Sequence, residues 1–508
     1  MGVTAARDPA LPQPVLAGGG ERAALLAFLL YVALFAAAAA AFRGVWTDEL
    51  WSLWMGLHDP SLPPVPARWT SDTHPPLFSA GTWLLQPIVG LDVTAWRLLN
   101  FSTFLYPVLV GWALGRRSPQ VAAFALVLIP LVASSPAFAN NIAEYRAYFP
   151  SLAFSTALSI LLYRISAAET DLRWRTDRRL AGFAAVTILI ALNLHYISAF
   201  ICGTMVAAVA IASWLRGKRG WFALLIASAA VAAVPLAASY LSQRAFVASL
   251  DSFWITTTPP QAAVAVARAL LGSTGLNLVA IGFAGFGSLL IWRGGPAALP
   301  WSRTYPAAIA AGLLVAAAVL IGINFIRPVV IERHLIALIP FAAGVIAALA
   351  APLLQGRRWA YLLLLANAAA VVAPLSLRAA RSDNWHEGAR IVAREVEACP
   401  RTLVHAAYEL RPRPGHPPNQ LEIVRWAMPH LGRRFGFAVI FHERLDGRPL
   451  PRSPAPCPTI VWAEHNGGLV PPNGQLAAMI GLGDAAAAAN MRVLGTNSGT
   501  VAILPPIQ

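Results

Sequence analysis

Charged residues are scarce in this chain of 508 residues: they make up 12% of the sequence, against roughly a quarter in an average soluble domain. Hydrophobic residues make up 57%. Nearly charge-free stretches of about 20 residues, long enough to cross the core of a bilayer, recur along the first three quarters of the chain. This composition excludes an ordinary soluble enzyme and predicts a multi-spanning membrane protein.

Lysine and cysteine are nearly absent. Only Lys218 among the 38 basic residues is lysine, and the arginines stand singly or in pairs between apolar stretches, so we expect no nucleic-acid partner. The three cysteines exclude a cysteine-rich zinc or disulfide scaffold. Cys399 and Cys457 either pair in an oxidising compartment or stay as two buried thiols. The first 20 residues contain no apolar core, so we expect no cleaved signal peptide.

Eleven apolar windows have the length of membrane-crossing helices. They lie near residues 23–42, 96–115, 120–138, 147–164, 180–197, 199–215, 221–240, 274–292, 305–324, 334–353 and 359–376. A further stretch, 75–90, is too short to cross and contains Pro87, so we interpret it as an interfacial or re-entrant helix. Counting it as a span would place the most basic loop, 164–179, outside, against the positive-inside rule.

The distribution of charge orients these spans. With the N-terminus inside, 16 of the 25 basic residues before position 380 lie in cytoplasmic segments. Eight of the 13 acidic residues in the same part lie on the outer side. Several stand at the ends of spans, where an ionised group is costly unless it is paired or solvated. The pattern therefore predicts a polar cavity that faces outward.

The composition changes after position 380, where 13 arginines and 10 acidic residues accompany short apolar runs. The segment WHEGARIVAREVEA predicts an amphipathic helix followed by a strand. We therefore divide the chain into a cytoplasmic tail (1–22), a transmembrane domain (23–379) and a small soluble α/β domain (380–508). The first outer loop covers 43–95, and the odd number of spans places the α/β domain outside the cytoplasm.

The first outer loop begins RGVWTDELWSLWMGL, directly after the first span. Asp48 and Glu49 are adjacent carboxylates at the membrane face, where low dielectric suits an acid to proton abstraction. The same pair could hold Mg²⁺ or Mn²⁺ through oxygen ligands, and loop solubility is the structural alternative. His74 precedes two prolines in SDTHPPLF, and a histidine there is by itself more often structural.

Asp-Glu after the first span, followed about 25 residues later by HPPL, resembles the GT-C type of membrane glycosyltransferase, which uses polyprenyl-phosphate sugars. This superfamily includes ArnT-like and protein-O-mannosyltransferase-like enzymes. Four further segments match in order: AWRLLNF with Arg97, NNIAEYRAYF with Glu144, Arg146 and Tyr148, LHYISAF with His195 and Tyr196, and RPVVIERHLIALIP with Arg327 and Arg333. The chain departs from the family at His334, where tyrosine is frequent, and at Ala147, where proline is frequent.

The resemblance implies an inverting transfer of a sugar from polyprenyl phosphate to a lipid, glycan or protein acceptor. Asp48 is expected to act as general base, and Glu49 to position the acceptor or a cation. Arg333 is the first candidate for the lipid phosphate, with Arg146 and Arg97 as secondary candidates, because a guanidinium offers a planar fork of donors. Snorkelling at the interface is the structural alternative for each arginine.

The expected substrate site therefore comprises residues from five segments: His74, Arg97, Glu144, Arg146, Tyr148, His195, Tyr196, Arg327 and Arg333. Glu144 and Arg146 could instead form only a local ion pair. The expected fold is a polytopic helical membrane protein with about eleven spans, an interfacial helix and a C-terminal α/β domain. Its expected location is a bacterial cytoplasmic membrane, with membrane lipid as a partner.

Two other functions are weighed against glycosyl transfer. A transporter or flippase for lipid-linked saccharides would normally show polar residues or broken helices near the bilayer midplane. Here the ionisable residues gather at the predicted outer ends of the spans. An assembly or scaffold protein with a decayed site is the third reading. The identity of the sugar, the acceptor and the oligomeric state have no local signature.

Overall fold

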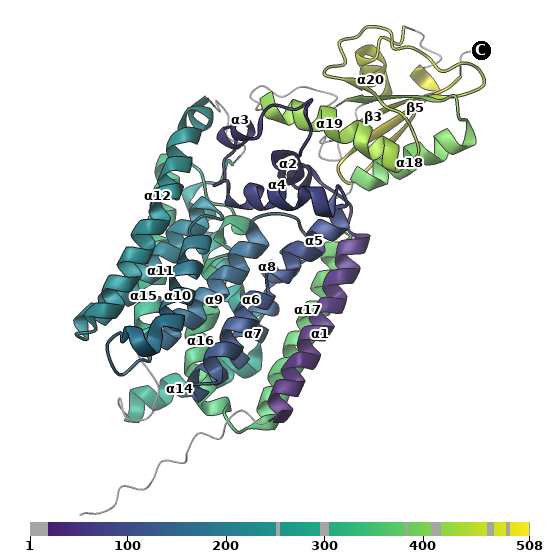
Figure 1. Cartoon of the computed structure of the whole chain (residues 1–508). Coiled ribbons are helices and arrows are strands. Elements are labelled where there is room, and N and C mark those ends of the chain that lie inside the picture. The colour runs from purple at the N-terminus through teal and green to yellow at the C-terminus, as the bar shows by residue number, and fades with distance from the viewer. Residues whose placement is uncertain are drawn as a thin grey trace, which may run out of the picture.

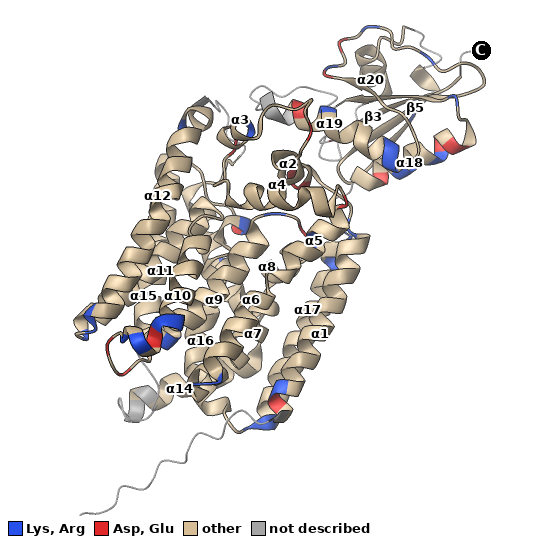
Figure 2. Ribbon diagram, in the orientation of Figure 1, with Lys and Arg blue, Asp and Glu red and all other residues tan. Residues whose placement is uncertain are grey.

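A bundle of long helices makes up most of the molecule, and a small mixed domain sits at one end of it (Figure 1). The computed structural model describes residues 19–506 apart from 250–254, 295–303, 382–384, 408–417, 465–471 and 484–487. Most of the predicted tail 1–22 therefore lies outside the described residues. Charged residues are sparse along the middle of the bundle and gather toward its two ends (Figure 2).

Seven helical segments are long and apolar enough to cross a membrane. They are α1 (Gly19–Phe42), the consecutive α5 (Val93–Ser102) and α6 (Leu105–Gly115), α9 (Tyr148–Ser166), α11 (Tyr196–Leu215), α12 (Arg219–Ser249), α15 (Thr304–Ile326) and α17 (Arg358–Ala380). An eighth candidate joins α13 (Pro259–Leu271) through the short η1 (Gly272–Thr274) to α14 (Leu278–Gly294), with a bend of 97°. The described chain is thus a polytopic helical protein with seven or eight candidate spans.

Each of the eleven predicted windows contains a helix, but three of these helices do not meet the criteria for a span. The helices α7 (Pro119–Ala133) and α16 (Leu338–Leu354) are short, pack against each other and are largely buried in the bundle. The third, α10 (Trp174–Ala191), begins with the charged segment WRTDRR. The prediction of a membrane-type helical bundle is confirmed, and the number of eleven crossings stays a prediction.

Short helices cover the end of the bundle that carries the small domain. They are α2 (Thr47–Met55), α3 (Val65–Thr70) and α4 (Leu77–Val89), together with the 3-10 turn η3 (Glu332–Leu335). The short helix α8 (Pro136–Asn141) instead packs inside the bundle, against α17. In Figure 1, α4 runs across the ends of the long helices. It includes Pro87 and coincides with the predicted helix over 75–90. Gly56 ends α2 against α4, where an added Cβ would lie 2.5 Å from Cβ of Thr82.

In the residues that the structure describes, the C-terminal domain has a five-stranded mixed sheet and the three helices named below. The strands are β1 (Leu403–Ala407), β2 (Ile440–His442), β3 (Thr459–Glu464), β4 (Arg492–Gly495) and β5 (Gly499–Leu504), in the order β2-β1-β3-β5-β4. The strand β1 is parallel to β2 and β3, whereas β5 is antiparallel to β3 and β4. The helices are α18 (Trp385–Ala398), α19 (Pro418–Arg434) and α20 (Asn473–Met479). The predicted helix-strand order of α18 and β1 is confirmed.

A disulfide joins Cys399 to Cys457, with their Cα atoms 5.5 Å apart. It connects the end of α18 to the segment that leads into β3. Of the two states left open by the sequence, the structure therefore shows the paired one. Cys202 is buried within α11 and is not part of a disulfide.

The C-terminal domain packs on the first outer loop. Trp385 and Trp462 share one buried cluster with Leu50 and Trp54 of α2. The backbone N–H of Trp385 donates to the carbonyl of Val45 at 3.0 Å, and α19 packs against α2. The helix that carries Asp48 and Glu49 is therefore held between the bundle and the sheet.

Glu464, at the end of β3, is a fully buried carboxyl group. It accepts hydrogen bonds from Trp462 Nε1 and Ser498 Oγ, both at 2.6 Å. Burial raises the pKa of Glu464 from 4.5 to about 8. Because the folded pKa lies above the unfolded one, the stability from this group is complete below pH 4.5 and is lost as the pH rises through 8.

The substitution Glu464→Gln is expected to remove this part of the pH dependence, because an amide has no proton to lose and can still bond both partners. Thermal unfolding followed between about pH 5 and pH 8.5 checks the expectation. The wild type should lose stability across this interval more steeply than the variant. Equal slopes for the two proteins would contradict the expectation.

Candidate active site

A cavity of about 590 Å³ lies beside α2, at the end of the bundle that carries the small domain. Its polar and charged walls come from Asp48, Asp72, Thr73, His74, Arg146, Tyr148, His195, Tyr196, Tyr240, Gln243, Arg327, Arg333 and His334. Its other walls come from Trp51, Ile197, Phe200, Phe246, Val247, Leu320, Ile323 and Val329. The cavity thus joins a charged part to an apolar part contributed by the long helices α11, α12 and α15.

Asp48 lies in the first turn of α2 and faces two arginines from distant segments. Its Oδ2 lies 3.0 Å from Nη1 of Arg333 and 3.7 Å from Nη2 of Arg146. The side chains of Asp48 and Arg333 keep exposed fractions of 26% and 28%, so solvent or a ligand can reach both. A carboxylate and two guanidiniums therefore meet at the cavity wall.

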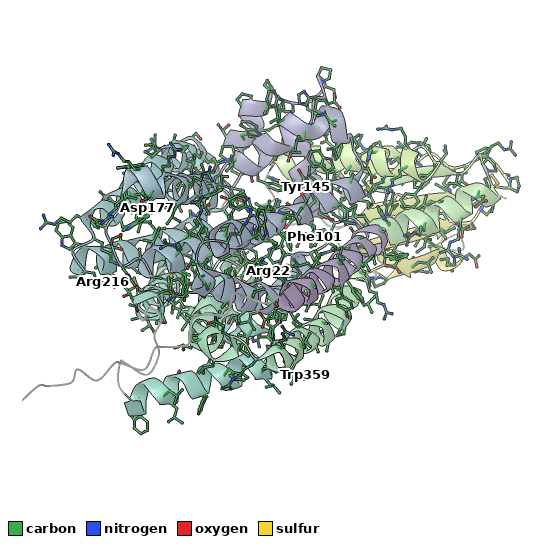
Figure 3. The ribbon with its side chains drawn as sticks, turned by 60° about the horizontal axis from the view of Figure 1, so that its bottom comes forward. Arg22, Phe101, Tyr145, Asp177, Arg216 and Trp359 are labelled. Carbon is green, nitrogen blue, oxygen red and sulfur yellow. A yellow bond between two sulfur atoms is a disulfide. The ribbon has the colours of Figure 1, made fainter. Side chains whose placement is uncertain are left out.

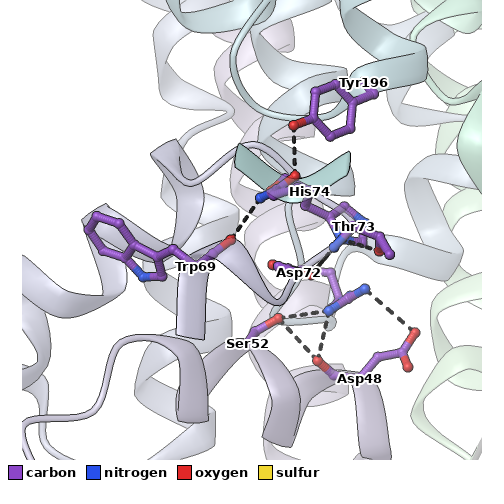
Figure 4. A network of polar contacts seen from close by, with 9 residues as sticks. Asp48, Ser52, Trp69, Asp72, Thr73, His74 and Tyr196 are labelled. Atoms are coloured by element: carbon purple, nitrogen blue, oxygen red, sulfur yellow. Dashed lines mark hydrogen bonds and ion pairs between the residues drawn. The ribbon is translucent and has the colours of Figure 1, made fainter. Parts of the chain in front are cut away.

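The two guanidiniums are held in fixed positions. Arg146 Nη1 donates to the carbonyl of Asp48 at 3.0 Å and to Oγ of Ser52 at 3.1 Å. Figure 4 labels these two partners and marks both hydrogen bonds with dashed lines. The guanidinium of Arg333 lies 5.4 Å from the ring of Trp46 and 5.7 Å from the ring of Tyr148. Cation–π contacts of this kind add stabilisation without neutralising the charge. Both arginines can therefore present charge toward an anion in the cavity.

A second acidic group enters the cavity beside His74. His74 Nδ1 lies 3.3 Å from Oδ1 of Asp72, and Thr73 lies between them in the loop (Figure 4). The His74 ring also lies 5.1 Å from the ring of His195 and 6.4 Å from that of Tyr148. The loop before α4 therefore brings a carboxylate and an imidazole to the wall of the same cavity.

Three histidine rings form a row along the cavity. The ring of His195 lies 5.1 Å from those of His74 and His334. Burial lowers the pKa of His195 well below its usual range and that of His334 to about 3, so both rings are neutral at pH 7. The Nδ1 of His334 lies 2.9 Å from the carbonyl of Val329, which assigns its proton to Nδ1. The rings of His195 and His334 therefore supply shape and hydrogen bonds and no charge.

Gln243 fixes the loop that carries His74. Its Nε2 donates to the carbonyls of Trp69 at 2.8 Å and His74 at 2.7 Å, and its Oε1 accepts from the hydroxyl of Tyr196 at 2.7 Å. Figure 4 shows Trp69, His74 and Tyr196 converging on this point. One amide on α12 therefore connects the first outer loop to α11.

The substitution Gln243→Ala is expected to loosen residues 69–74 and to lower turnover about tenfold, because misplaced positioning groups of this kind cost one to two orders of magnitude. Limited proteolysis of the loop and the activity assay described below check both effects. Tyr196→Phe is the matched control for the proteolysis, since it removes one of the three hydrogen bonds and leaves both loop carbonyls bonded. Unchanged proteolysis of Gln243→Ala would contradict the role of this residue.

Eight of the eleven predicted site residues line the same cavity: Asp48, His74, Arg146, Tyr148, His195, Tyr196, Arg327 and Arg333. Glu49, Arg97 and Glu144 do not line it. Arg97 Nε and Nη2 donate to the two carboxylate oxygens of Glu49 at 2.7 and 2.6 Å, and both side chains are buried. The backbone N–H of Tyr145 also donates to Glu49 at 2.8 Å.

The geometry therefore corrects the expected roles of Glu49 and Arg97. The guanidinium of Arg97 also donates hydrogen bonds to the carbonyls of Ala40 and Arg43 through Nη1 and of Gly44 through Nη2. Both side chains are buried and neither lines the cavity, so the pair holds α2 to α5 instead of facing a substrate. Glu144 is also buried, and burial raises its pKa to about 7.

The expected cation site does not fit this arrangement. Asp48 faces the arginines whereas Glu49 is turned into the pair with Arg97, so the adjacent carboxylates share no oxygen-lined space. Across the described part of the chain, no three His, Cys, Asp or Glu side chains are grouped to hold a metal ion.

Sequence reasoning missed Asp72, Gln243 and Tyr240 as cavity residues. The sequence shows Asp72 two positions before His74, but it does not show that the Asp72 side chain is buried at the cavity. The position of Gln243 was predictable as functional, because it is a polar amide near the end of a long apolar helix. Such a residue needs a partner inside a membrane protein.

Comparison with known proteins does not assign the chain to a family. The sequence matches no protein-family model, and no curated protein matches it. The function is therefore argued from the cavity and its charges.

Proposed function

We propose that the protein is an integral-membrane glycosyltransferase that moves a sugar from a polyprenyl-phosphate carrier to an acceptor hydroxyl. The observation that carries the proposal is the meeting of Asp48 with Arg333 and Arg146 at a cavity that continues between apolar helix surfaces. The guanidiniums suit a phosphate, the apolar walls suit an isoprenoid chain and the carboxylate suits a hydroxyl proton.

The ion pair explains how one site can serve both partners. Before the donor binds, Asp48 neutralises Arg333 and keeps it at the cavity wall. The donor phosphate then competes for the guanidiniums and leaves the carboxylate free to bind the acceptor hydroxyl. Charge-assisted hydrogen bonds from arginine to phosphate are short and frequently bidentate, which favours this exchange.

The transfer is a single displacement. Asp48 takes the proton of the acceptor hydroxyl while that oxygen attacks C1 of the sugar. The bond between C1 and the phosphate oxygen breaks, and polyprenyl phosphate leaves with its new charge on Arg333 and Arg146. The neutral rings of His195 and His334 and the loop held by Gln243 enclose the sugar and limit hydrolysis by water.

The proposal includes the number of membrane crossings and the orientation of the chain in the membrane. Eleven crossings with the N-terminus inside place the cavity and the C-terminal domain on the outer face of a bacterial cytoplasmic membrane. This orientation is supported by the 16 of 25 basic residues that it leaves inside. There the phosphate of a lipid-linked donor lies at the depth of Arg333, and the tail stays in the bilayer.

The function is tested with the purified protein in liposomes that contain a panel of polyprenyl-phosphate hexoses and pentoses and an extract of envelope acceptors. Release of polyprenyl phosphate reports transfer whatever the sugar is. Movement of the lipid-linked sugar between leaflets, without release of polyprenyl phosphate, would instead indicate the alternative of a flippase. If the protein neither transfers the sugar nor moves the lipid-linked sugar, both proposals are overturned, and a scaffold function is left.

The substitution Arg333→Gln is expected to raise the donor KM about 10- to 100-fold, because a hydrogen bond to a charged group contributes about 1.5–3 kcal/mol. Arg358→Gln removes an equal charge from an exposed position at the other end of the bundle and is the matched control. An unchanged donor KM in Arg333→Gln, with normal folding, would remove Arg333 from the phosphate site.

A further inference from the structure

Two cavities adjoin each other at the end of the bundle opposite Asp48. The first, of about 410 Å³, is an apolar groove between α1, α6 and α7. Its walls include Leu25, Leu26, Leu29, Leu109, Leu126 and Ile129. Arg22 and Arg116 are its two charged lining residues. The groove therefore runs along hydrophobic helix surfaces and is basic where α1 begins and α6 ends.

The second cavity, of about 540 Å³, is strongly basic. Arg116, Arg117, Arg164 and Arg179 line it, against the single carboxylate of Asp177. Oδ2 of that carboxylate already accepts from the backbone N–H of Arg173 at 2.9 Å. Trp112 and Arg116 line both cavities, and the Arg116 guanidinium lies 4.6 Å from the Trp112 ring. An apolar groove and a pocket of four guanidiniums thus share a wall.

The figures place this region at one end of the bundle. In Figure 2, basic residues gather at the lower end of α1 and around α10. Figure 3 brings the same end forward and labels Arg22 and Asp177 there. Within the part of the chain that the structure describes, none of Arg116, Arg117, Arg164 and Arg179 forms an ion pair. Arg116, Arg117 and Arg179 are exposed and Arg164 is partly buried, so an anion can reach all four, and four like charges around one space attract it.

We propose that this double cavity binds an anionic phospholipid of the leaflet opposite the Asp48 site, with an acyl chain in the groove and the phosphate among the arginines. Basic pockets between membrane helices recognise anionic headgroups in this way. A headgroup with two phosphates matches four guanidiniums better than one with a single phosphate, so cardiolipin should bind more tightly than phosphatidylglycerol. The site depends on membrane embedding and not on the proposed glycosyl transfer.

Binding is measured by native mass spectrometry of the detergent-purified protein with cardiolipin, phosphatidylglycerol, phosphatidylcholine and soluble glycerol phosphate. We expect the order of affinity to follow the order of the lipids named, with glycerol phosphate weaker than either anionic lipid. Phosphatidylcholine binding as tightly as cardiolipin would overturn the proposal. Glycerol phosphate binding as tightly as phosphatidylglycerol would also overturn it, because the groove would then contribute nothing.

Two pairs of substitutions locate the site. Arg116→Gln with Arg164→Gln should weaken cardiolipin binding about 25-fold, because each basic residue near an anionic lipid contributes roughly fivefold. Arg175→Gln with Arg358→Gln removes the same charge from exposed residues that line neither cavity, and should change binding less than about twofold. Equal losses in the two pairs would show that only general surface charge is involved and would overturn the site.

The groove is tested separately at its exposed wall. Leu26 and Leu109 are 59% and 58% exposed, so Leu26→Ala with Leu109→Ala shortens the groove wall without placing a polar group against lipid and should leave the fold intact. This pair is expected to weaken phosphatidylglycerol binding and to leave glycerol phosphate unaffected. Polyprenyl phosphate that displaces cardiolipin at equal concentration would identify a second carrier site instead and would overturn the proposal. The transfer assay is independent of every one of these outcomes.

Discussion

Asp48→Asn is expected to abolish sugar transfer, with kcat reduced about 10²- to 10⁴-fold, because a general base contributes that factor. The amide has the same size as the carboxyl group but cannot take the proton from the acceptor hydroxyl. The substitution also replaces the negative charge that lies 3.0 Å from Arg333 and 3.7 Å from Arg146 with a neutral amide, so both guanidiniums compete better for the donor phosphate. The donor KM should therefore stay the same or fall while kcat falls.

This division of kcat from KM separates a catalytic role from a structural one. A merely structural Asp48 would lower the amount of folded protein and leave the kcat of what remains unchanged. Asp59→Asn is the matched control, because Asp59 lies in the same loop, does not line the cavity and is partly exposed to solvent. Normal kcat in Asp48→Asn, measured as release of polyprenyl phosphate, would remove the general base from the proposal.

Hydrophobic windows predicted the helices of the bundle well, since burial in a bilayer demands long apolar segments with satisfied backbones. The same windows could not decide which helices cross, because α7 and α16 are as apolar as the candidate spans but have only 15 and 17 residues. Placing Asp48 and Arg333 at the same end of the bundle was predictable from the span ends alone. Their separation of 3.0 Å was not.

The first outer loop shows why site roles are harder to predict than site positions. The sequence suggested a loop at Asp48 and Glu49, but these residues begin the helix α2. Consecutive residues on a helix point about 100° apart, so the two carboxylates face different surroundings. One meets the cavity and the other meets Arg97. Adjacent acids that a sequence presents as one motif therefore divide into one candidate base and one structural partner.

The second large effect is expected on the free energy of unfolding, when Arg97 is replaced. Arg97→Met should destabilise the protein by about 3–5 kcal/mol, because removing one partner of a buried pair leaves the other charge uncompensated. Glu49 is fully buried and would then keep a single hydrogen bond, the one from the Tyr145 N–H. The carbonyls of Ala40, Arg43 and Gly44 would lose the donors that hold the end of α1 against α5.

A double substitution distinguishes this loss from an effect on the substrate. Glu49→Gln combined with Arg97→Met removes both charges and should recover part of the lost thermal stability, since no uncompensated buried charge is left. Thermal unfolding of the detergent-purified proteins measures the recovery, and the transfer assay measures the donor KM of whatever stays folded. If Arg97→Met unfolds like the wild type but raises the donor KM, Arg97 belongs to the phosphate site after all. Because its guanidinium is closed off by a carboxylate and three carbonyls, we expect the opposite: lower stability, and an unchanged donor KM in the folded fraction.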